Sequence, residues 1–262
     1  MPLRAILFDW AGTTVDYGSR APTSVFLRIF ASRGVNITVP EARGPMGMAK
    51  REHIATVLAL PRVTAEWTKV HGRPPVDGDV QAMYDEFLPL QKATLAAGSD
   101  LIPGAVEAIN ACRRMGLKIG SSTGYTRALM DVVAPIAAAG GYAPDCILCA
   151  DDAPQGRPAP WMNFRAAELL NVYPMSDLLV VDDTPIGIAA GRNAGCPTVA
   201  VSQTGNSLGL SQAEVEALPA AELTSRLVAI EQEFRAQGAD FVLRSVAELP
   251  ALLVQQFGLT AR

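Results

Sequence analysis

Short apolar runs recur along the chain, and each gives way to small or polar residues within a few positions. Six of these runs predict β-strands, at residues 4–9, 117–122, 145–150, 178–182, 197–201 and 239–243. Between them the apolar residues take helical spacing, at residues 103–115, 124–139, 158–171 and 185–195. Continuously apolar strands that alternate with helices indicate a parallel sheet with both faces covered. The pattern therefore predicts an α/β fold with a doubly wound, Rossmann-like core.

One connection is far longer than a single crossover helix requires. The first two predicted strands are separated by a segment at about residues 19–98, with helical patterns at 22–34, 45–60, 64–71 and 77–97. We expect this segment to be an inserted all-α cap domain that covers the carboxyl ends of the strands. Residues 1–18 and 99–262 then form the core domain, in which the segment 202–236 carries a further long helix before the last strand.

Composition and charge exclude several functional classes. The 262 residues carry a net charge of −4, which gives no basic surface for nucleic acid. No apolar run reaches the length of a membrane span, and the first residues lack the pattern of a secretory signal. We expect a cytoplasmic protein whose partners include neither nucleic acid nor a membrane. Cys146 and Cys149 form a lone CxxC in a predicted strand, which favours buried apolar packing because a metal site needs two more ligands.

Polar residues follow four of the predicted strands directly. They are Asp9 with Thr13, Thr123-Gly124, Arg157-Pro158 and Asp182-Asp183. Ligands of doubly wound sheets bind at the carboxyl ends of the strands, so we expect these clusters to meet in one crevice. Together they offer a carboxylate nucleophile, hydroxyl and amide donors, a fixed cation and carboxylates for Mg²⁺. That set of groups suits phosphoryl transfer through a covalent intermediate.

Each cluster also has a structural interpretation that the sequence leaves open. Asp9 fits a strand-end cap, and the threonines with Gly124 fit ordinary turns. The Asp182-Asp183 pair fits a helix N-cap before Pro185, and Arg157 fits a surface position after a glycine. Four independent coincidences of this kind are a weaker explanation than one shared site.

Four segments resemble the haloacid dehalogenase superfamily, in the order that the family has them. They are LFDWAGTT, SSTG, GRPAP and VVDDTPIGIAAGRNAG. The resemblance implies that Asp9 is the nucleophile that forms an aspartyl-phosphate. It also implies that Asp9, the Ala11 carbonyl and Asp183 bind Mg²⁺, with Asp182 beside them. Thr13, Thr123, Gly124 and Arg157 are then the expected contacts of the phosphorus group.

Ala11 departs from the common phosphatase pattern of that superfamily. The pattern has a second aspartate there, which protonates an alkoxide leaving group and then activates water. A phosphate-ester hydrolase without this acid is expected to be poor. Arg157 replaces the usual lysine and keeps the positive charge. We therefore expect a substrate whose leaving group is stabilised by residues outside the core.

The cap supplies a candidate in the segment RGPMGMAKREHI, residues 43–54. A helix that begins at Gly44-Pro45 places Lys50 early, with Met46 and His53 on the same face. The positive end of the helix dipole and burial against methionines lower the pKa of Lys50 toward a free amine. A free amine condenses with an aldehyde, and the protonated imine is an electron sink that permits carbon–phosphorus cleavage.

The pairing of DWAGTT with GMAKREHI, together with TAEWTKVHGRPP, is similar to the phosphonoacetaldehyde hydrolase family within that superfamily. The resemblance implies that Lys50 forms a Schiff base with a small-molecule phosphonate, phosphonoacetaldehyde, while Asp9 attacks its phosphorus. Acetaldehyde and phosphate are the implied products, in 2-aminoethylphosphonate degradation. It also implies that His53 handles a proton near the imine, that Met46 packs on Lys50, and that caps join a homodimer.

Two other functions fit parts of the same pattern. A phosphatase or phosphomutase acting on a phosphate ester uses the core clusters without Lys50. A phosphate-binding or regulatory module that has lost catalysis uses them without turnover, although the retained Asp9 argues against it.

Overall fold

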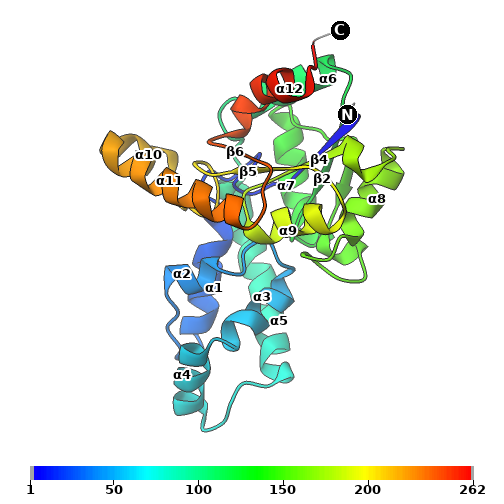
Figure 1. Cartoon of the computed structure of the whole chain (residues 1–262). Coiled ribbons are helices and arrows are strands. Elements are labelled where there is room, and N and C mark those ends of the chain that lie inside the picture. Colours follow the sequence, from blue (N-terminus) through cyan, green and yellow to red (C-terminus); the bar gives the residue numbers. More distant parts are fainter. Residues whose placement is uncertain (1–2, 261–262) are drawn as a thin grey trace.

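The computed structural model describes residues 3–260, in which six strands form one parallel sheet (Figure 1). The strand order is β3-β2-β1-β4-β5-β6. The strands are β1 (Ala5–Phe8), β2 (Lys118–Ser122), β3 (Cys146–Leu148), β4 (Leu178–Asp182), β5 (Thr198–Val201) and β6 (Phe241–Leu243). All six predicted strands are confirmed, with ends that differ by no more than two residues.

The strand order and register explain where a site can form. The chain order reverses between β1 and β4, and in doubly wound sheets such a switch point opens a crevice at the carboxyl edge. Phe8, the last residue of β1, pairs with Ser121 of β2 and Val181 of β4. One residue further along each chain, Asp9 therefore lies between Ser122 and Asp182. A parallel register thus converts three separate sequence positions into neighbours.

Helices cover both faces of the sheet, as the continuously apolar strands predict. Ile6 and Phe8 pack toward α6, α7 and α12. Ala5 and Leu7 pack toward α8 on the opposite face, where α9 and α11 cover Ala200. The α-helices of this part of the chain, including the short α10, are α6 (Ala105–Arg114), α7 (Arg127–Ala139), α8 (Trp161–Leu169), α9 (Pro185–Asn193), α10 (Gln212–Ala217), α11 (Ala220–Ala236) and α12 (Leu249–Phe257). Within residues 3–260, no helix has the length and apolar sequence needed to cross a membrane.

Five helices between β1 and β2 form a separate bundle below the carboxyl edge of the sheet (Figure 1). They are α1 (Ala21–Ala31), α2 (Val39–Arg43), α3 (Lys50–Leu58), α4 (Pro61–His71) and α5 (Asp77–Leu95). The bundle has its own apolar core, in which Phe26, Phe30, Trp67 and Phe87 are fully or almost fully buried. We call this bundle the cap and the sheet with its covering helices the core.

One cap prediction is wrong in its boundary. The helix predicted over residues 45–60 begins only at Lys50, and a turn over 44–49 separates it from α2. Gly47 has φ +94°, a left-handed conformation that a right-handed helix cannot include. Met46 therefore lies in the turn, and the predicted i−4 relation to Lys50 within one helix does not hold.

Candidate active site

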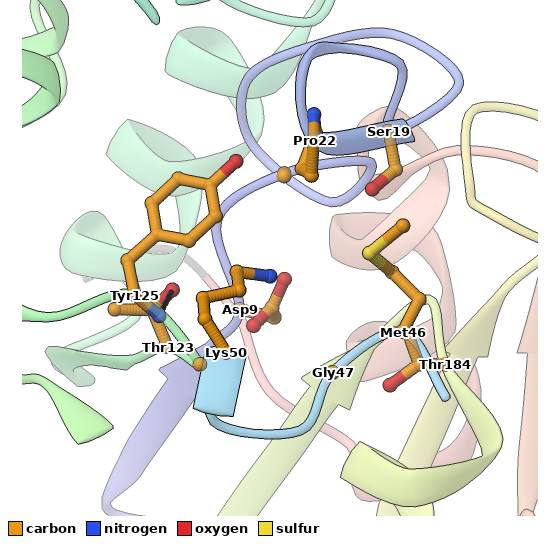
Figure 2. Close-up of a pocket in the computed structure, with 11 residues that line it drawn as sticks. Asp9, Ser19, Pro22, Met46, Gly47, Lys50, Thr123, Tyr125 and Thr184 are labelled. Carbon is orange, nitrogen blue, oxygen red and sulfur yellow. Dashed lines mark hydrogen bonds between the residues drawn. The ribbon is translucent and has the colours of Figure 1, made fainter. Parts of the chain in front are cut away.

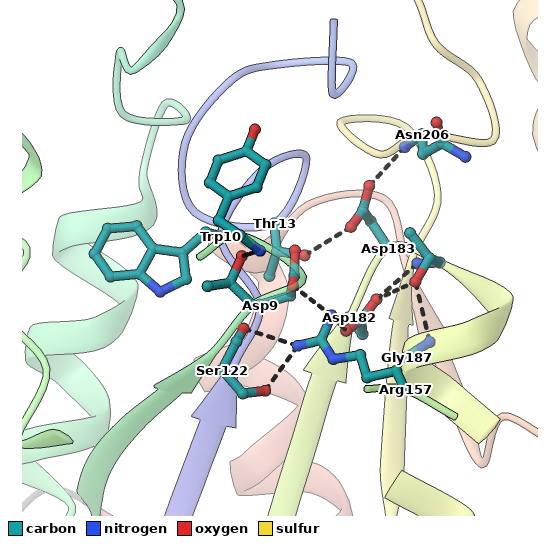
Figure 3. A network of polar contacts seen from close by, with 12 residues as sticks. Asp9, Trp10, Thr13, Ser122, Arg157, Asp182, Asp183, Gly187 and Asn206 are labelled. Carbon is teal, nitrogen blue, oxygen red and sulfur yellow. Dashed lines mark hydrogen bonds and ion pairs between the residues drawn. The ribbon is translucent and has the colours of Figure 1, made fainter. Parts of the chain in front are cut away.

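Three carboxylates meet at the switch point of the sheet. Asp9 follows β1, while Asp182 ends β4 and Asp183 follows it. Oxygen atoms from all three side chains lie within 4.8 Å of one another, and all three residues are buried (Figure 3). Mutual repulsion and lost hydration make such a group unfavourable unless positive charge compensates it.

Arg157 supplies part of that positive charge from the loop before α8. Its Nη1 donates to Asp9 Oδ1 at 2.7 Å and lies 3.1 Å from Asp182 Oδ2. Its Nη2 donates to the Ser122 carbonyl and to Ser122 Oγ, both at 2.7 Å. The guanidinium is buried and held from two sides, so its position beside Asp9 is fixed.

Asp183 is oriented by donors from two other loops (Figure 3). Thr13 Oγ1 donates to Asp183 Oδ1 at 3.3 Å, and the Asn206 backbone N–H donates to Oδ2 at 2.7 Å. Burial, followed by the charges of Asp9 and Asp182, raises the pKa of Asp183 well above its ordinary value. Burial, followed by the charge of Asp182, raises the pKa of Asp9 to about 7, while Arg157 opposes both effects.

This environment fits a divalent metal ion. Asp182 Oδ2 accepts no hydrogen bond from the described residues, although it is buried close to Arg157. Three carboxylates facing a single guanidinium leave negative charge that a hard cation neutralises, and oxygen ligands of this kind suit Mg²⁺. Asp9, Asp183 and the Ala11 carbonyl are the predicted ligands, and Asp182 is close enough to join them.

Lys50 enters the site from the cap. It is the first residue of α3 and is 3% exposed, and its Nζ lies 5.0 Å from the centroid of the Tyr125 ring (Figure 2). Burial lowers the pKa of Lys50 to about 8, and the nearby Asp9 charge opposes that shift. The positive end of the α3 dipole acts in the same direction as burial. Lys50 therefore carries a far larger fraction of free amine at neutral pH than an exposed lysine does.

His53 lies one turn behind Lys50 in α3 and is completely buried. Its Nε2 is 2.8 Å from the Ala42 carbonyl, which requires Nε2 to carry the proton. Nδ1 has no hydrogen-bond partner within residues 3–260, and the ring stacks on Phe26 at 3.8 Å. Burial, with Lys50 next, lowers the pKa of His53 well below its ordinary value, so the imidazole is neutral.

One pocket between cap and core contains much of the predicted site (Figure 2). Six predicted residues line it: Asp9, Ala11, Met46, Lys50, Thr123 and Gly124. The others stand behind this lining, because Thr13 binds Asp183, Arg157 binds Asp9, and His53 is buried within the cap. The structure thus places six of the predicted residues at the pocket surface and the others directly behind them.

The sequence analysis missed four lining residues, Ser19, Pro22, Gly47 and Thr184, and it assigned no role to a fifth, Tyr125. Ser19 and Pro22 follow directly after the first core segment, where the chain crosses into the cap. Their place beside the crevice is the signal that could have identified them. The sequence around Gly47 gave no indication of a site residue, because its role depends on close contact with Thr184 of the core.

Glycines allow the cap turn 44–49 to lie directly on the core. A Cβ atom at Gly124 would lie 2.6 Å from the Met48 carbonyl oxygen, and one at Gly47 would lie 2.5 Å from Thr184 Oγ1. A Cβ atom at Gly156 would contact Ala49 at 3.2 Å. Gly124 was predicted as a phosphate contact, and the structure adds this close packing as a second reason for glycine.

Comparison with known proteins identifies the family of this chain. A family model described as haloacid dehalogenase-like hydrolase matches residues 3–195. Phosphonoacetaldehyde hydrolase from Paraburkholderia xenovorans is 47% identical over 94% of this chain and 92% of its own length. The protein of the same name from Bacillus cytotoxicus is 45% identical over 97% of this chain and 96% of its own length. The chain belongs to the phosphonoacetaldehyde hydrolase family of the haloacid dehalogenase-like hydrolases.

A solved structure supports the assignment to this family. The crystal structure titled as a phosphonoacetaldehyde hydrolase-like protein from Oleispira antarctica superimposes with a TM-score of 0.95 at 37% identity. The superposition covers 97% of this chain and 92% of the Oleispira antarctica chain. Family membership, expected from the core and cap motifs, and the α/β fold with a helical cap, expected from the hydrophobic pattern, are thereby confirmed.

In this family member, the Asp182 carboxylate lies against the Cα of Gly187, where a side chain at position 187 would otherwise be. Asp182 Oδ1 accepts from the Thr184 N–H at 2.9 Å and from Thr184 Oγ1 at 2.7 Å. A Cβ atom at Gly187 would lie 1.9 Å from Asp182 Oδ2. The Asp182 carboxylate therefore fills the position that a side chain at 187 would need (Figure 3).

Proposed function

We propose that this protein hydrolyses the carbon–phosphorus bond of phosphonoacetaldehyde, giving acetaldehyde and phosphate. The observation that carries the proposal is the pocket shared by a buried cap amine, Lys50, and a core carboxylate, Asp9. A two-carbon aldehyde with a phosphonate end is short enough to meet both groups at once. The names of the relatives support the same substrate, and degradation of 2-aminoethylphosphonate is the expected setting.

Lys50 acts first in this proposal. Its free amine adds to the aldehyde carbon, a water molecule leaves, and the product is an imine that becomes protonated on nitrogen. The lowered pKa of Lys50 favours the addition because only the neutral amine is a nucleophile. His53, neutral and with an unpartnered Nδ1, is the group that we assign to proton transfer near the imine.

Asp9 then attacks phosphorus. Arg157 hydrogen-bonds Oδ1 of its carboxylate, and we assign the attack to the other oxygen. The new O–P bond forms as the C–P bond breaks, and the electron pair moves through carbon to the iminium nitrogen, giving an enamine. Water then hydrolyses the aspartyl-phosphate, while protonation at carbon and hydrolysis of the imine release acetaldehyde and restore Lys50.

Mg²⁺, when bound by Asp9, Asp183 and the Ala11 carbonyl, supplies positive charge that screens the repulsion between Asp9 and the anionic phosphonate. Arg157 holds Asp9 in place and adds its own charge to the same side of the site. Ala11 is consistent with this chemistry, because the electrons of the leaving carbon pass to the imine and need no acid at position 11.

Borohydride trapping tests the proposal. The protein is mixed with phosphonoacetaldehyde and borohydride, which reduces an imine to a stable amine, and the modified peptide is identified by mass spectrometry. We expect the adduct on Lys50. An adduct on another lysine, or none under conditions in which phosphate is released, contradicts the proposal.

The pH dependence of that trapping is a second prediction. Lys50 reacts only as the free amine, so the initial trapping rate should fall about tenfold per pH unit below a midpoint near 8. Measuring it in the Asp9→Asn variant removes the titration of that carboxyl. Because the Asp9 charge raises the pKa of Lys50, the midpoint in the variant should lie somewhat lower. A rate that keeps rising to pH 10 would show an ordinary, exposed lysine.

A further inference from the structure

Arg43, the last residue of α2, reaches from the cap into the core. Its Nη1 donates to the Gly18 carbonyl at 2.9 Å and to the Asn206 carbonyl and Oδ1, both at 3.1 Å. Its Nη2 donates to the Gly209 carbonyl at 3.2 Å. These four acceptors belong to the chain that joins core and cap, residues 16–20, which we call the linker, and to one core loop, residues 204–209. The guanidinium therefore connects α2, the linker and this loop.

The same core loop supports a predicted metal ligand. The Asn206 backbone N–H donates to Asp183 Oδ2 at 2.7 Å, while Asn206 Nδ2 donates back to the Arg43 carbonyl at 3.3 Å. Asn206 thus contacts Asp183 through its backbone N–H, and it contacts Arg43 through its side chain as well as its carbonyl. The contact between the two domains and the contact to the carboxylate can therefore be changed separately.

The linker between core and cap is bound to this loop as well. The Gly18 N–H donates to the Thr204 carbonyl at 2.7 Å. Asp16 and Ser19 have φ values of 54° and 50°, left-handed conformations that are unfavourable for residues with side chains. Such a backbone persists only where neighbouring groups hold it. The Asp16 carboxylate accepts from the Arg20 and Ala21 N–H groups, and Arg43 and the 204–209 loop hold Gly18, which lies between Asp16 and Ser19.

We propose that Arg43 is a positioning residue that couples closure of the cap to metal binding at Asp183. When the cap is closed, Arg43 fixes the 204–209 loop, and the Asn206 N–H then holds Asp183 in its ligand orientation. When the cap opens, the guanidinium leaves Asn206 and Gly209, and the loop loses those contacts. Coupling of this kind is reciprocal, so bound metal also favours the closed cap. The inference rests on the metal site of the proposed function.

Calorimetric titration of Mg²⁺ into the substrate-free protein measures the coupling directly. We expect Arg43→Ala to weaken Mg²⁺ binding about tenfold, within the usual range of coupling between two sites. Arg43→Lys keeps the charge but not the forked geometry, so its affinity should fall between those of Arg43→Ala and the unaltered protein. Arg73→Ala is the matched control, because Arg73 pairs with Asp79 inside the cap.

Asn206→Ala separates the proposed coupling from direct support of Asp183. This variant keeps the backbone N–H on Asp183 and removes the side-chain contacts to Arg43. We expect it to weaken Mg²⁺ binding too, and the double variant with Arg43→Ala to be less impaired than the product of the two single effects. Thermal melts identify any variant that fails to fold. If Arg43→Ala does not fold, the Mg²⁺ affinity of Asn206→Ala tests the coupling.

Hydrogen exchange gives the second readout. Mg²⁺ should slow exchange of the Gly18 amide in the unaltered protein and have a smaller effect in Arg43→Ala. Unchanged Mg²⁺ affinity in folded Arg43→Ala and Asn206→Ala would overturn the coupling. Absence of Mg²⁺ binding in the unaltered protein would instead overturn the metal site, so the two failures are distinguishable.

Discussion

Replacing Lys50 with arginine is expected to abolish carbon–phosphorus cleavage, lowering turnover on the order of 10⁴-fold or more. Arginine keeps a positive charge in the pocket, but its guanidinium does not deprotonate in proteins and cannot form the imine. Phosphate release from phosphonoacetaldehyde measures the effect. The loss should appear in kcat, because chemistry rather than recognition of the phosphonate is removed.

Two further variants sharpen the Lys50 experiment. Lys69→Arg is the matched control, because Lys69 is an exposed cap residue. Lys50→Met tests whether the bulk of arginine causes the loss, since methionine is shorter and needs no hydration in a buried position. Substantial turnover in Lys50→Arg would favour a mechanism without an imine, such as that of a phosphate-ester hydrolase.

Replacing Asp9 with asparagine should stop phosphate release, with a fall of roughly 10⁵-fold, while the imine still forms. Asparagine has nearly the same shape, and its Oδ1 can still accept the hydrogen bond that Arg157 donates to Asp9. It lacks the charge needed for attack on phosphorus. Borohydride should therefore leave a phosphonoethyl group on Lys50, where the unaltered protein also gives an ethyl group.

Asp131→Asn provides the control for that substitution, because Asp131 is exposed on α7. Rapid phosphate release by Asp9→Asn would contradict the assignment of Asp9 as the nucleophile. Loss of both phosphate release and trapping would show instead that Asp9 is needed to bind the aldehyde near Lys50.

The sheet was predictable because each strand carries its own signal. Ile6, Leu7 and Phe8 are apolar on both faces of β1, and the run stops at Asp9, so composition alone gives the position and end of the strand. Residues that follow such strands are brought together by topology, which is why Asp9 and Asp183 could be placed in one site. Neither conclusion needs knowledge of side-chain contacts.

The cap side of the site was less predictable, since it depends on how the cap and core pack together. Pro45 suits a helix start, yet the turn extends to Ala49. Within it Gly47, at φ +94°, lies too close to Thr184 of the core to carry a side chain. Arg43 and Asn206 are 163 positions apart, and no local pattern indicates that they are hydrogen-bonded. Such contacts follow from the tertiary structure alone.

The crowding at Asp182 and Gly187 limits how this site can change during evolution. A side chain at position 187 would require the Asp182 carboxylate to leave this space, because its Cβ would lie 1.9 Å from Asp182 Oδ2. A single substitution that adds an acidic residue at 187 creates a steric conflict before it creates a ligand. Transfer of the acidic group from position 182 to position 187 therefore requires the Asp182 carboxylate to be displaced or removed.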